Sequence, residues 1–180
     1  MKKIFLLIAA CFSLTAPLAA HPCQGAYVTG FGGANFKQDQ KISGDTKLDW
    51  ETGYALSGSV GYKWEPFRVE LEGAYRRNTA KHLGKHYGQG VTSALVNGIY
   101  DLDFLQLPSG ITPYVGVGIG TALHNGNGKG KDLRFAWQGI AGVALPVSDR
   151  VDLITEYRYF NAGFKQDHNH TVGAGLRFWF

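Results

Sequence analysis

The feature that most constrains the fold is an alternation of side-chain character with a period of two residues. Between residues 67 and 76, the odd positions hold Phe, Val, Leu, Gly and Tyr, and the even positions hold Arg, Glu, Glu, Ala and Arg. Residues 50–62 repeat the pattern, which is that of a β-strand with one apolar and one polar face. After residue 20 no run approaches the roughly 18–20 consecutive apolar residues of a spanning helix. A membrane location would therefore require strands.

Eight segments carry this pattern, and each is long enough for a tilted spanning strand, which needs about 9–11 residues. They are 25–36, 49–62, 67–77, 91–102, 112–124, 134–146, 150–161 and 169–180. Hydrophilic and mostly long connectors, near 37–48, 78–90, 125–133 and 162–168, alternate with short ones at 63–66 and 147–149 and one of intermediate length at 103–111. The pattern predicts an all-β fold, an eight-stranded antiparallel up-and-down transmembrane barrel, with both termini periplasmic and long loops extracellular.

A soluble β-sandwich or lipocalin-like barrel would alternate in the same way, because alternation alone does not say which face meets water. The aromatic residues favour the membrane alternative. They cluster toward segment ends on the apolar face, as in the interfacial girdles of outer-membrane barrels. They are Trp50, Tyr62, Phe67, Tyr75, Tyr100, Phe135, Trp137, Tyr157, Tyr159, Phe178 and Phe180.

The N-terminal residues predict a cleavable signal peptide. A basic n-region precedes an apolar run too short for a spanning helix, and the small residues Ala19 and Ala20 close the segment. We expect cleavage after Ala20, with Ala19 as the alternative because Leu18 is larger than the residue usual at its position. The predicted domains are a signal peptide, 1–20, and an outer-membrane β-barrel domain, 21–180.

A lipoprotein signal is a weaker alternative. Residues 8–11 read Ile-Ala-Ala-Cys, which resembles a lipobox, but only about five apolar residues precede it, too few for an h-region. Removing the signal peptide removes two lysines and no acid, so the formal net charge falls from +4 to +2. Only Cys23 then remains, which excludes an internal disulfide and a cysteine-based metal cluster. We expect no cofactor and no bound metal.

Four stretches resemble the opacity-protein-like family of small outer-membrane β-barrel surface antigens. They are GSVGY (58–62) leading into RVELEGAY (68–75), PYVGVGIG (113–120), EYRYF (156–160) and VGAGLRFWF (172–180). Together they run over nearly the whole mature chain in the family's order. The resemblance implies insertion by the barrel-assembly machinery, which reads a terminal aromatic residue; Phe180, with Phe178, matches that signal. It does not imply a particular activity, because the family is named for location and antigenicity.

Enzymes that act on lipid A occur on this fold, but their residues are not matched here. A deacylase-like site needs His beside Ser on a late strand, and residues 159–163 read Tyr-Phe-Asn-Ala-Gly. The GxGxG at Gly116, Gly118 and Gly120 lacks a following helix, so we interpret it as space for bulky lumen partners and not as a nucleotide fingerprint. We expect no enzymatic activity.

If the apolar face meets lipid, the charged face lines the lumen. The expected lumen set is Glu51, Arg68, Glu70, Glu72, Arg76, Asp101, Asp152, Glu156, Arg158 and Arg177, with Asn97 and Gln138 between them. An eight-stranded barrel is only just wide enough for side chains to fill, and buried charges must be paired. We interpret the set as an ion-pair core. A proton or ion path and an acid/base pair of carboxylates are the alternatives.

The most lopsided charge run lies in the second long connector. Residues 76–87 hold four fixed positive charges and two histidines, without an acid. The candidates for polyanion binding are Arg77, Lys81, His82, Lys85 and His86. Contact with lipopolysaccharide phosphates is the simpler explanation for these charges, and an adhesin surface for sulfated glycans is the more specific one. Two histidine pairs, at 82 and 86 and at 168 and 170, lack a third ligand at fixed spacing and are interpreted as surface histidines.

These features favour a structural surface antigen of the outer membrane, with a plugged polar lumen and basic extracellular loops. The alternative is an adhesin-like protein that binds polyanions, such as lipopolysaccharide or sulfated glycans, through its loops. A narrow channel and a lipid A-modifying enzyme are weaker alternatives. The expected partners are outer-membrane lipid and lipopolysaccharide, the barrel-assembly machinery and a host or environmental polyanion. We expect no nucleic-acid partner.

Overall fold

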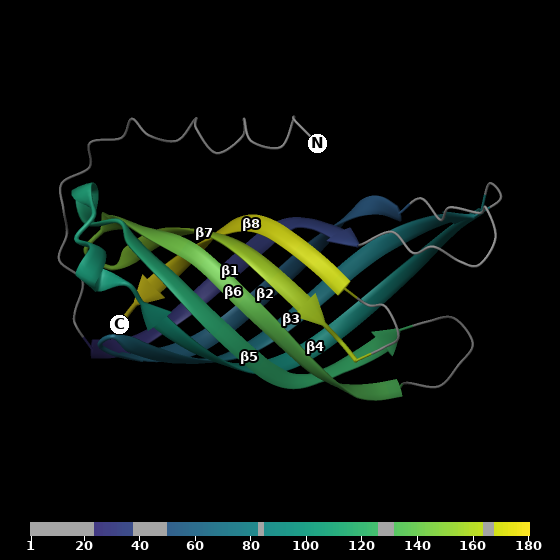
Figure 1. Ribbon diagram of the computed structural model, residues 1–180, viewed down its shortest axis with the longest axis horizontal. Coiled ribbons are helices and arrows are strands. Elements are labelled where there is room, and N and C mark those ends of the chain that lie inside the picture. Colours follow the sequence, from purple (N-terminus) through teal and green to yellow (C-terminus); the bar gives the residue numbers. More distant parts are fainter. Residues whose placement is uncertain (1–23, 38–49, 83–84, 126–131, 164–167) are drawn as a thin grey trace.

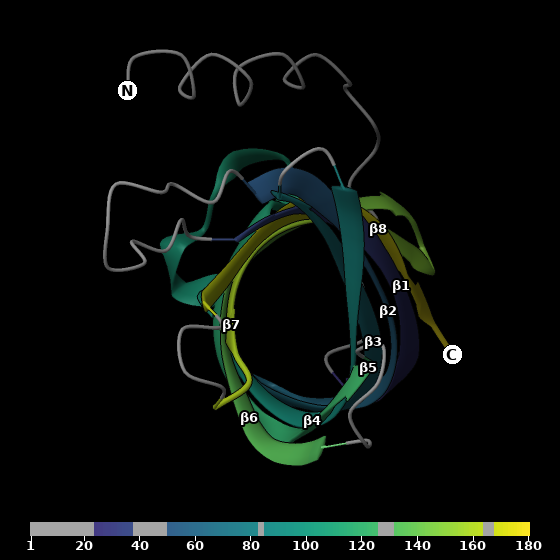
Figure 2. The same cartoon turned by 90° about the vertical axis from the view of Figure 1, so that its right-hand side faces the viewer.

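Eight strands in sequence order form one closed barrel in the computed structural model, which describes residues 24–37, 50–82, 85–125, 132–163 and 168–180 (Figure 1). The strands are β1 Gln24–Lys37, β2 Trp50–Trp64, β3 Phe67–His82, β4 Lys85–Asp101, β5 Thr112–Asn125, β6 Asp132–Ser148, β7 Val151–Asn161 and β8 His168–Trp179. Each strand pairs antiparallel with the next, and β8 pairs with β1 to close the ring (Figure 2). The predicted fold is confirmed. The predicted signal peptide and Cys23 lie outside the described residues.

The connector expected as a loop over 78–90 is instead mostly a two-stranded ribbon, because β3 and β4 continue past the other strands. The ladder pairs Lys81 with His86 and His82 with Lys85. Continued pairing satisfies the backbone N–H and C=O groups that face the partner strand, and no proline interrupts it. The ribbon reaches beyond the other strands at the right-hand end of the barrel in Figure 1.

Alternation along each strand separates a buried polar face from an exposed apolar face. On β7, Asp152, Glu156 and Arg158 are buried, while Leu153 and Tyr157 between them are exposed. A soluble barrel has the reverse arrangement, with an apolar interior. An apolar outer face with a polar lumen is typical of a barrel surrounded by lipid. The described residues contain no helix of the length and apolar character needed to cross a membrane.

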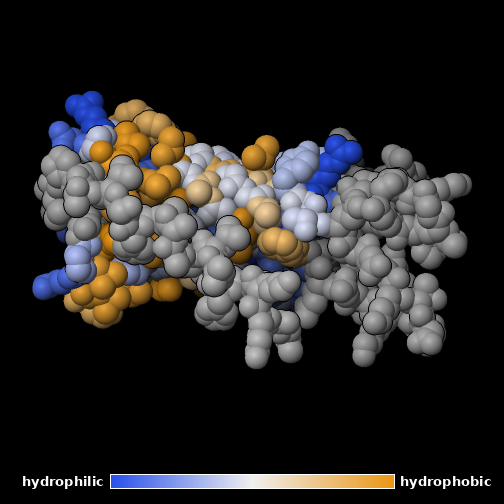
Figure 3. All heavy atoms as spheres, turned by 90° about the horizontal axis from the view of Figure 1, so that it is seen from above, coloured by the Kyte–Doolittle hydropathy of each residue, from blue (hydrophilic) through white to orange (hydrophobic). Residues whose placement is uncertain are grey.

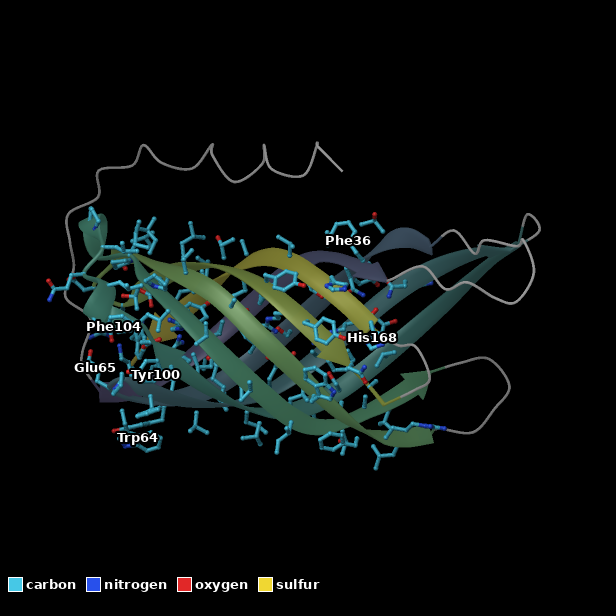
Figure 4. All side chains as sticks on the ribbon, viewed as in Figure 1. Phe36, Trp64, Glu65, Tyr100, Phe104 and His168 are labelled. Atoms are coloured by element: carbon cyan, nitrogen blue, oxygen red, sulfur yellow. The ribbon has the colours of Figure 1, made fainter. Side chains whose placement is uncertain are left out.

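Aromatic side chains border the apolar outer face at both ends. Near the C-terminus, the rings of Phe67 and Tyr100 lie 5.1 Å apart between centroids, and Figure 4 shows Trp64 and Tyr100 at this end. Toward the ribbon, the ring of Trp137 lies 5.3 Å from that of Tyr159. Hydrophobic residues also gather over the end near the C-terminus in Figure 3. The two borders mark the height of the lipid-facing belt.

Candidate functional site

The barrel interior gathers the charged side chains of inward-facing strand positions. Nine of the ten predicted lumen residues are buried there, and the side chain of Glu51 lies outside the described part of the structure. Lys63, expected in a turn, is instead an inward residue of β2 and joins the set. The buried charges of the described residues are therefore five cations and five carboxylates: Lys63, Arg68, Arg76, Arg158, Arg177, Glu70, Glu72, Asp101, Asp152 and Glu156. Equal numbers of opposite charges let each ion find a partner in a region of low dielectric.

The layer nearest the C-terminus contains two groups of ion pairs. Asp101 bridges two cations: its Oδ1 accepts from Nε of Arg68 at 2.9 Å, and its Oδ2 lies 3.1 Å from Nζ of Lys63. In the second group, Nη1 of Arg177 lies 3.3 Å from Oδ2 of Asp152. β2, β3 and β4 position the first group, while β7 and β8 position the second.

A row of Tyr27, Gly61 and Glu70 crosses β1, β2 and β3 in register. The Tyr27 hydroxyl donates to Oε1 of Glu70 at 2.8 Å. The phenol passes over Gly61, where an added Cβ would lie 2.5 Å from the Tyr27 ring. The tyrosine reaches the carboxylate because the residue between them has no side chain.

The same arrangement recurs four strands further on, where Tyr114, Gly142 and Glu156 lie in register on β5, β6 and β7. The Tyr114 hydroxyl donates to Oε1 of Glu156 at 2.6 Å, and a Cβ at Gly142 would lie 2.7 Å from the tyrosine ring. The guanidinium carbon of Arg177 lies 5.4 Å from the centroid of this ring and 5.3 Å from that of Tyr27. Cation–π attraction therefore adds to the ion pairs.

Glu72 is the centre of the next layer toward the ribbon. Its Oε2 lies 3.1 Å from Nη1 of Arg158 and accepts from Nδ2 of Asn97 at 3.0 Å and from Nε2 of Gln138 at 3.1 Å. Nε of Arg158 also donates to Glu156 at 2.6 Å, so this arginine bridges two carboxylates. The two amides that the sequence placed among the charges therefore hold a carboxylate in position.

The polarity of the lumen changes at Arg76. Its Nη1 donates to the Ser93 hydroxyl at 2.8 Å and its Nη2 donates to Oε1 of Gln138 at 3.1 Å. The guanidinium carbon lies 3.8 Å from the centroid of the Phe160 ring, so an aromatic face covers one side of the cation. Toward the ribbon from this point, the buried polar side chains that the structure describes carry no charge.

An uncharged cluster of Asn35, Asn78, Asn169 and Thr171 occupies the lumen layer nearest the ribbon. Nδ2 of Asn35 donates to Oδ1 of Asn78 at 3.1 Å, and Nδ2 of Asn78 donates to Oδ1 of Asn169 at 3.0 Å. The Thr171 hydroxyl donates to Oδ1 of Asn35 at 2.8 Å. Sequence reasoning missed these residues because it searched for charge; their inward positions in the alternation were the available signal.

The polyanion candidates lie on the ribbon. Arg77 is exposed on the outer face of β3. The side chains of Lys81, His82, Lys85 and His86 lie outside the described part of the structure, while their backbones form two facing pairs of the ladder. Among the described residues, no group of three or more His, Cys, Asp or Glu side chains is arranged to hold a metal ion.

The histidines of β8 are engaged by tyrosines on the outer face. The hydroxyl of Tyr157 and Nδ1 of His170 are hydrogen bonded at 2.7 Å, and the hydroxyl of Tyr159 and Nδ1 of His168 at 2.6 Å. Asn161 contacts the same Nδ1 of His168 at 3.1 Å. These contacts make the histidines part of the aromatic border.

The residues of the predicted assembly signal lie at the end of β8. Phe178 is exposed on the outer face of the strand. Phe180 follows the strand with 78% of its surface exposed, and its backbone N–H donates to the carbonyl of Ala26 at 3.1 Å. The last residue is thus tied to β1 through its backbone, while its side chain is exposed.

A closed antiparallel barrel with an apolar outer face, aromatic borders and a charged lumen defines a transmembrane β-barrel of the outer-membrane class. The chain belongs to the family described as outer membrane protein beta-barrel domain, which it matches over residues 4–180. The predicted family resemblance and the predicted outer-membrane location are confirmed.

Several relatives are named as outer-membrane or surface proteins. Outer membrane protein PagN of Salmonella typhimurium is 28% identical over 217 residues, which cover 96% of this chain and 90% of that protein. The 25 kDa outer-membrane immunogenic protein of Brucella ovis is 28% identical over 153 residues, which cover 82% of this chain and 61% of that protein. The crystal structure of Neisserial surface protein A matches with a TM-score of 0.66 at 22% identity, covering 87% of this chain and 97% of that one. At that identity the structural match supports the fold alone.

Proposed function

We propose that the protein is a non-conducting surface barrel whose lumen is filled by its ion-pair network and whose basic ribbon contacts anionic partners outside the cell. This function requires both termini in the periplasm and the β3–β4 ribbon outside, which is the orientation that short and long connectors favour. The surface antigens among its relatives support a role at the cell surface.

The observation that carries the first part is the layered filling of the lumen. Buried ion pairs, the Tyr–Gly–Glu rows and the Asn35 cluster succeed one another along the barrel. Ion-paired and hydrogen-bonded side chains in so narrow a barrel leave little room for a continuous file of water.

The test is conductance of the refolded barrel in planar bilayers. We expect no stable current step from the wild type. A double variant, Arg76→Ala with Phe160→Ala, removes a buried cation and the ring that covers it and should leak. A reproducible step from the wild-type protein would show an open channel and would refute the proposal.

Ribbon charge supports polyanion binding as the second part of the function. Arg77 is exposed, and Lys81 and Lys85 belong to the same ribbon. Exposed charges act through an attraction that is screened over about 8 Å at physiological ionic strength, so binding should weaken as salt rises.

Binding of heparin and of lipopolysaccharide to the refolded barrel tests this part. We expect Lys81→Glu and Lys85→Glu to weaken binding without changing the folded fraction. Arg150→Glu is the matched control, because Arg150 is exposed in the β6–β7 turn at the opposite end. Equal binding by all variants, or no effect of salt, would refute a role for the ribbon.

A further inference from the structure

The connector between β4 and β5 carries an apolar surface that strand alternation does not account for. It contains two short 3₁₀ turns, η1 (Asp103–Leu105) and η2 (Pro108–Gly110). Within it, Phe104, Leu105 and Leu107 are 68%, 47% and 41% exposed. Three large apolar side chains gathered at one surface point to an interaction site.

The connector projects outward from the barrel. When the barrel is viewed along its axis in Figure 2, the backbone of this connector lies outside the ring of strands. The N–H of Leu105 donates to the carbonyl of Leu102, and that of Gln106 donates to the carbonyl of Asp103, both at 3.1 Å. Gln106 then adopts the left-handed region at φ 42°, which is unfavourable for a residue with a Cβ and persists where the surroundings require it. This residue ends η1 and lies between the apolar residues Leu105 and Leu107.

The charged residue of the connector faces the mouth of the barrel. Oδ2 of Asp103 lies 4.0 Å from Nζ of Lys63, which also lies 3.1 Å from Asp101 and 3.4 Å from Glu65. These residues, with Thr112, help to line a cavity of about 170 Å³ at this end. The connector is therefore amphipathic, with its charge toward the barrel mouth and its apolar residues exposed.

The apolar residues lie at the same end of the barrel as one of the two aromatic borders. The connector begins directly after β4, on which Tyr100 packs against Phe67 at 5.1 Å between ring centroids. In Figure 4, Phe104 lies at the same end of the barrel as Tyr100 and Trp64. Phenylalanine and leucine at the level of an aromatic border gain by burial at the boundary between headgroups and acyl chains.

We propose that the β4–β5 connector is a membrane anchor, which inserts Phe104, Leu105 and Leu107 into the lipid leaflet beside the barrel wall. In the orientation proposed above, this is the periplasmic leaflet. The anchor would hold the barrel at a set depth and keep the cavity mouth at the membrane surface. The occupant is lipid, because the surface adjoins the belt that lipid already covers.

Nitroxide labels on single cysteines test the anchor in the mature chain with Cys23→Ser, refolded into phosphatidylcholine bilayers. Labels at 104, 105 and 107 should collide with oxygen several times more often than with a water-soluble nickel chelate, as a label at Phe67 should. A label at Glu65, exposed in the β2–β3 turn, should show the reverse ratio. Depth measured in a symmetric bilayer does not depend on orientation, so an inverted topology would leave this result unchanged.

Two outcomes would overturn the anchor. Labels at 104, 105 and 107 that meet the chelate as freely as the label at Glu65 would show that the connector stays in water. Labels that are open to water in pure lipid but protected in native outer membranes would assign the surface to a protein partner instead.

Discussion

Arg158 shows how much a single residue of the lumen contributes, because it faces two carboxylates, Glu72 and Glu156. Arg158→Ala leaves both without this cation, and we expect the free energy of unfolding to fall by about 3–5 kcal/mol. Arg68→Ala should act similarly through Asp101. Urea unfolding of the refolded barrel, followed by tryptophan fluorescence, measures the loss.

A matched control distinguishes the effect of losing a buried ion pair from the effect of losing one positive charge. Arg150 is exposed in the β6–β7 turn, and Arg150→Ala should change the free energy of unfolding by less than about 0.5 kcal/mol. Equal effects of Arg158→Ala and Arg150→Ala would mean that the lumen pairs add nothing to stability.

We expect the ionisation of Asp103 to make the stability of the barrel depend on pH. Burial raises its pKa above the ordinary value of 3.8, while Lys63 acts in the opposite direction. The folded state therefore keeps this proton to higher pH than the unfolded state, so the free energy of unfolding falls as pH rises from about 4 through the raised pKa. Asp103→Asn should flatten this part of the stability profile.

Unfolding between pH 4 and pH 8 measures that profile for the wild type, Asp103→Asn and the control Asp149→Asn in the exposed β6–β7 turn. The control should keep the wild-type slope. A lower stability of Asp103→Asn at neutral pH would instead show that attraction to Lys63 outweighs the cost of burial.

Two glycines of β6 differ in the space around them. A Cβ at Gly142 would lie 2.7 Å from the Tyr114 ring, whereas a Cβ at Gly139 would meet nothing within 4 Å. Gly142→Ala should therefore displace the tyrosine from Glu156 and lower the free energy of unfolding by about 1–3 kcal/mol. Gly139→Ala on the same strand should be nearly neutral. Equal losses of stability in the two variants would show that the space above Gly142 is not needed for the contact between Tyr114 and Glu156. Urea unfolding of both variants decides between these results.

The last strand carries the predicted assembly signal. Deleting Phe180 should lower the amount of folded barrel in the outer membrane, because the terminal aromatic residue is the feature that the resemblance assigns to recognition. Heat-modifiable migration on gels measures the folded fraction. Phe135→Ala, on the exposed outer face of β6, removes a similar ring without touching the end of β8. An unchanged folded fraction after the deletion would show that Phe180 is not an assembly signal, and it would leave the assignment of the barrel fold unaffected.

For the whole molecule, orientation is the property to test first. Epitope tags inserted within 38–49, or at 83–84 in the β3–β4 connector, should be accessible to antibody on intact cells. A tag in the 63–66 turn should become accessible only after the outer membrane is permeabilised. Labelling of that turn on intact cells would mean that the topology is inverted.

The strands followed from the sequence wherever one face meets lipid. β7 was expected at 150–161 and spans Val151–Asn161, and β5 was expected at 112–124 and spans Thr112–Asn125. The ribbon over 78–90 escaped prediction because few of its residues are apolar, so the alternation in the sequence disappears while backbone pairing continues. Lys63 was predicted to lie in a turn, but β2 continues to Trp64, so Lys63 belongs to the strand.

The sequence by itself determined that the chain would form strands and that its arginines and carboxylates would share one face of them. Only the tertiary structure decided that this face is the inside, because closure of β8 on β1 gives the sheet an interior. The partners were also decided there. Tyr27 meets Glu70 and Arg158 meets Glu72 across distances in sequence of 43 and 86 residues, and strand register, which no local pattern encodes, sets those contacts.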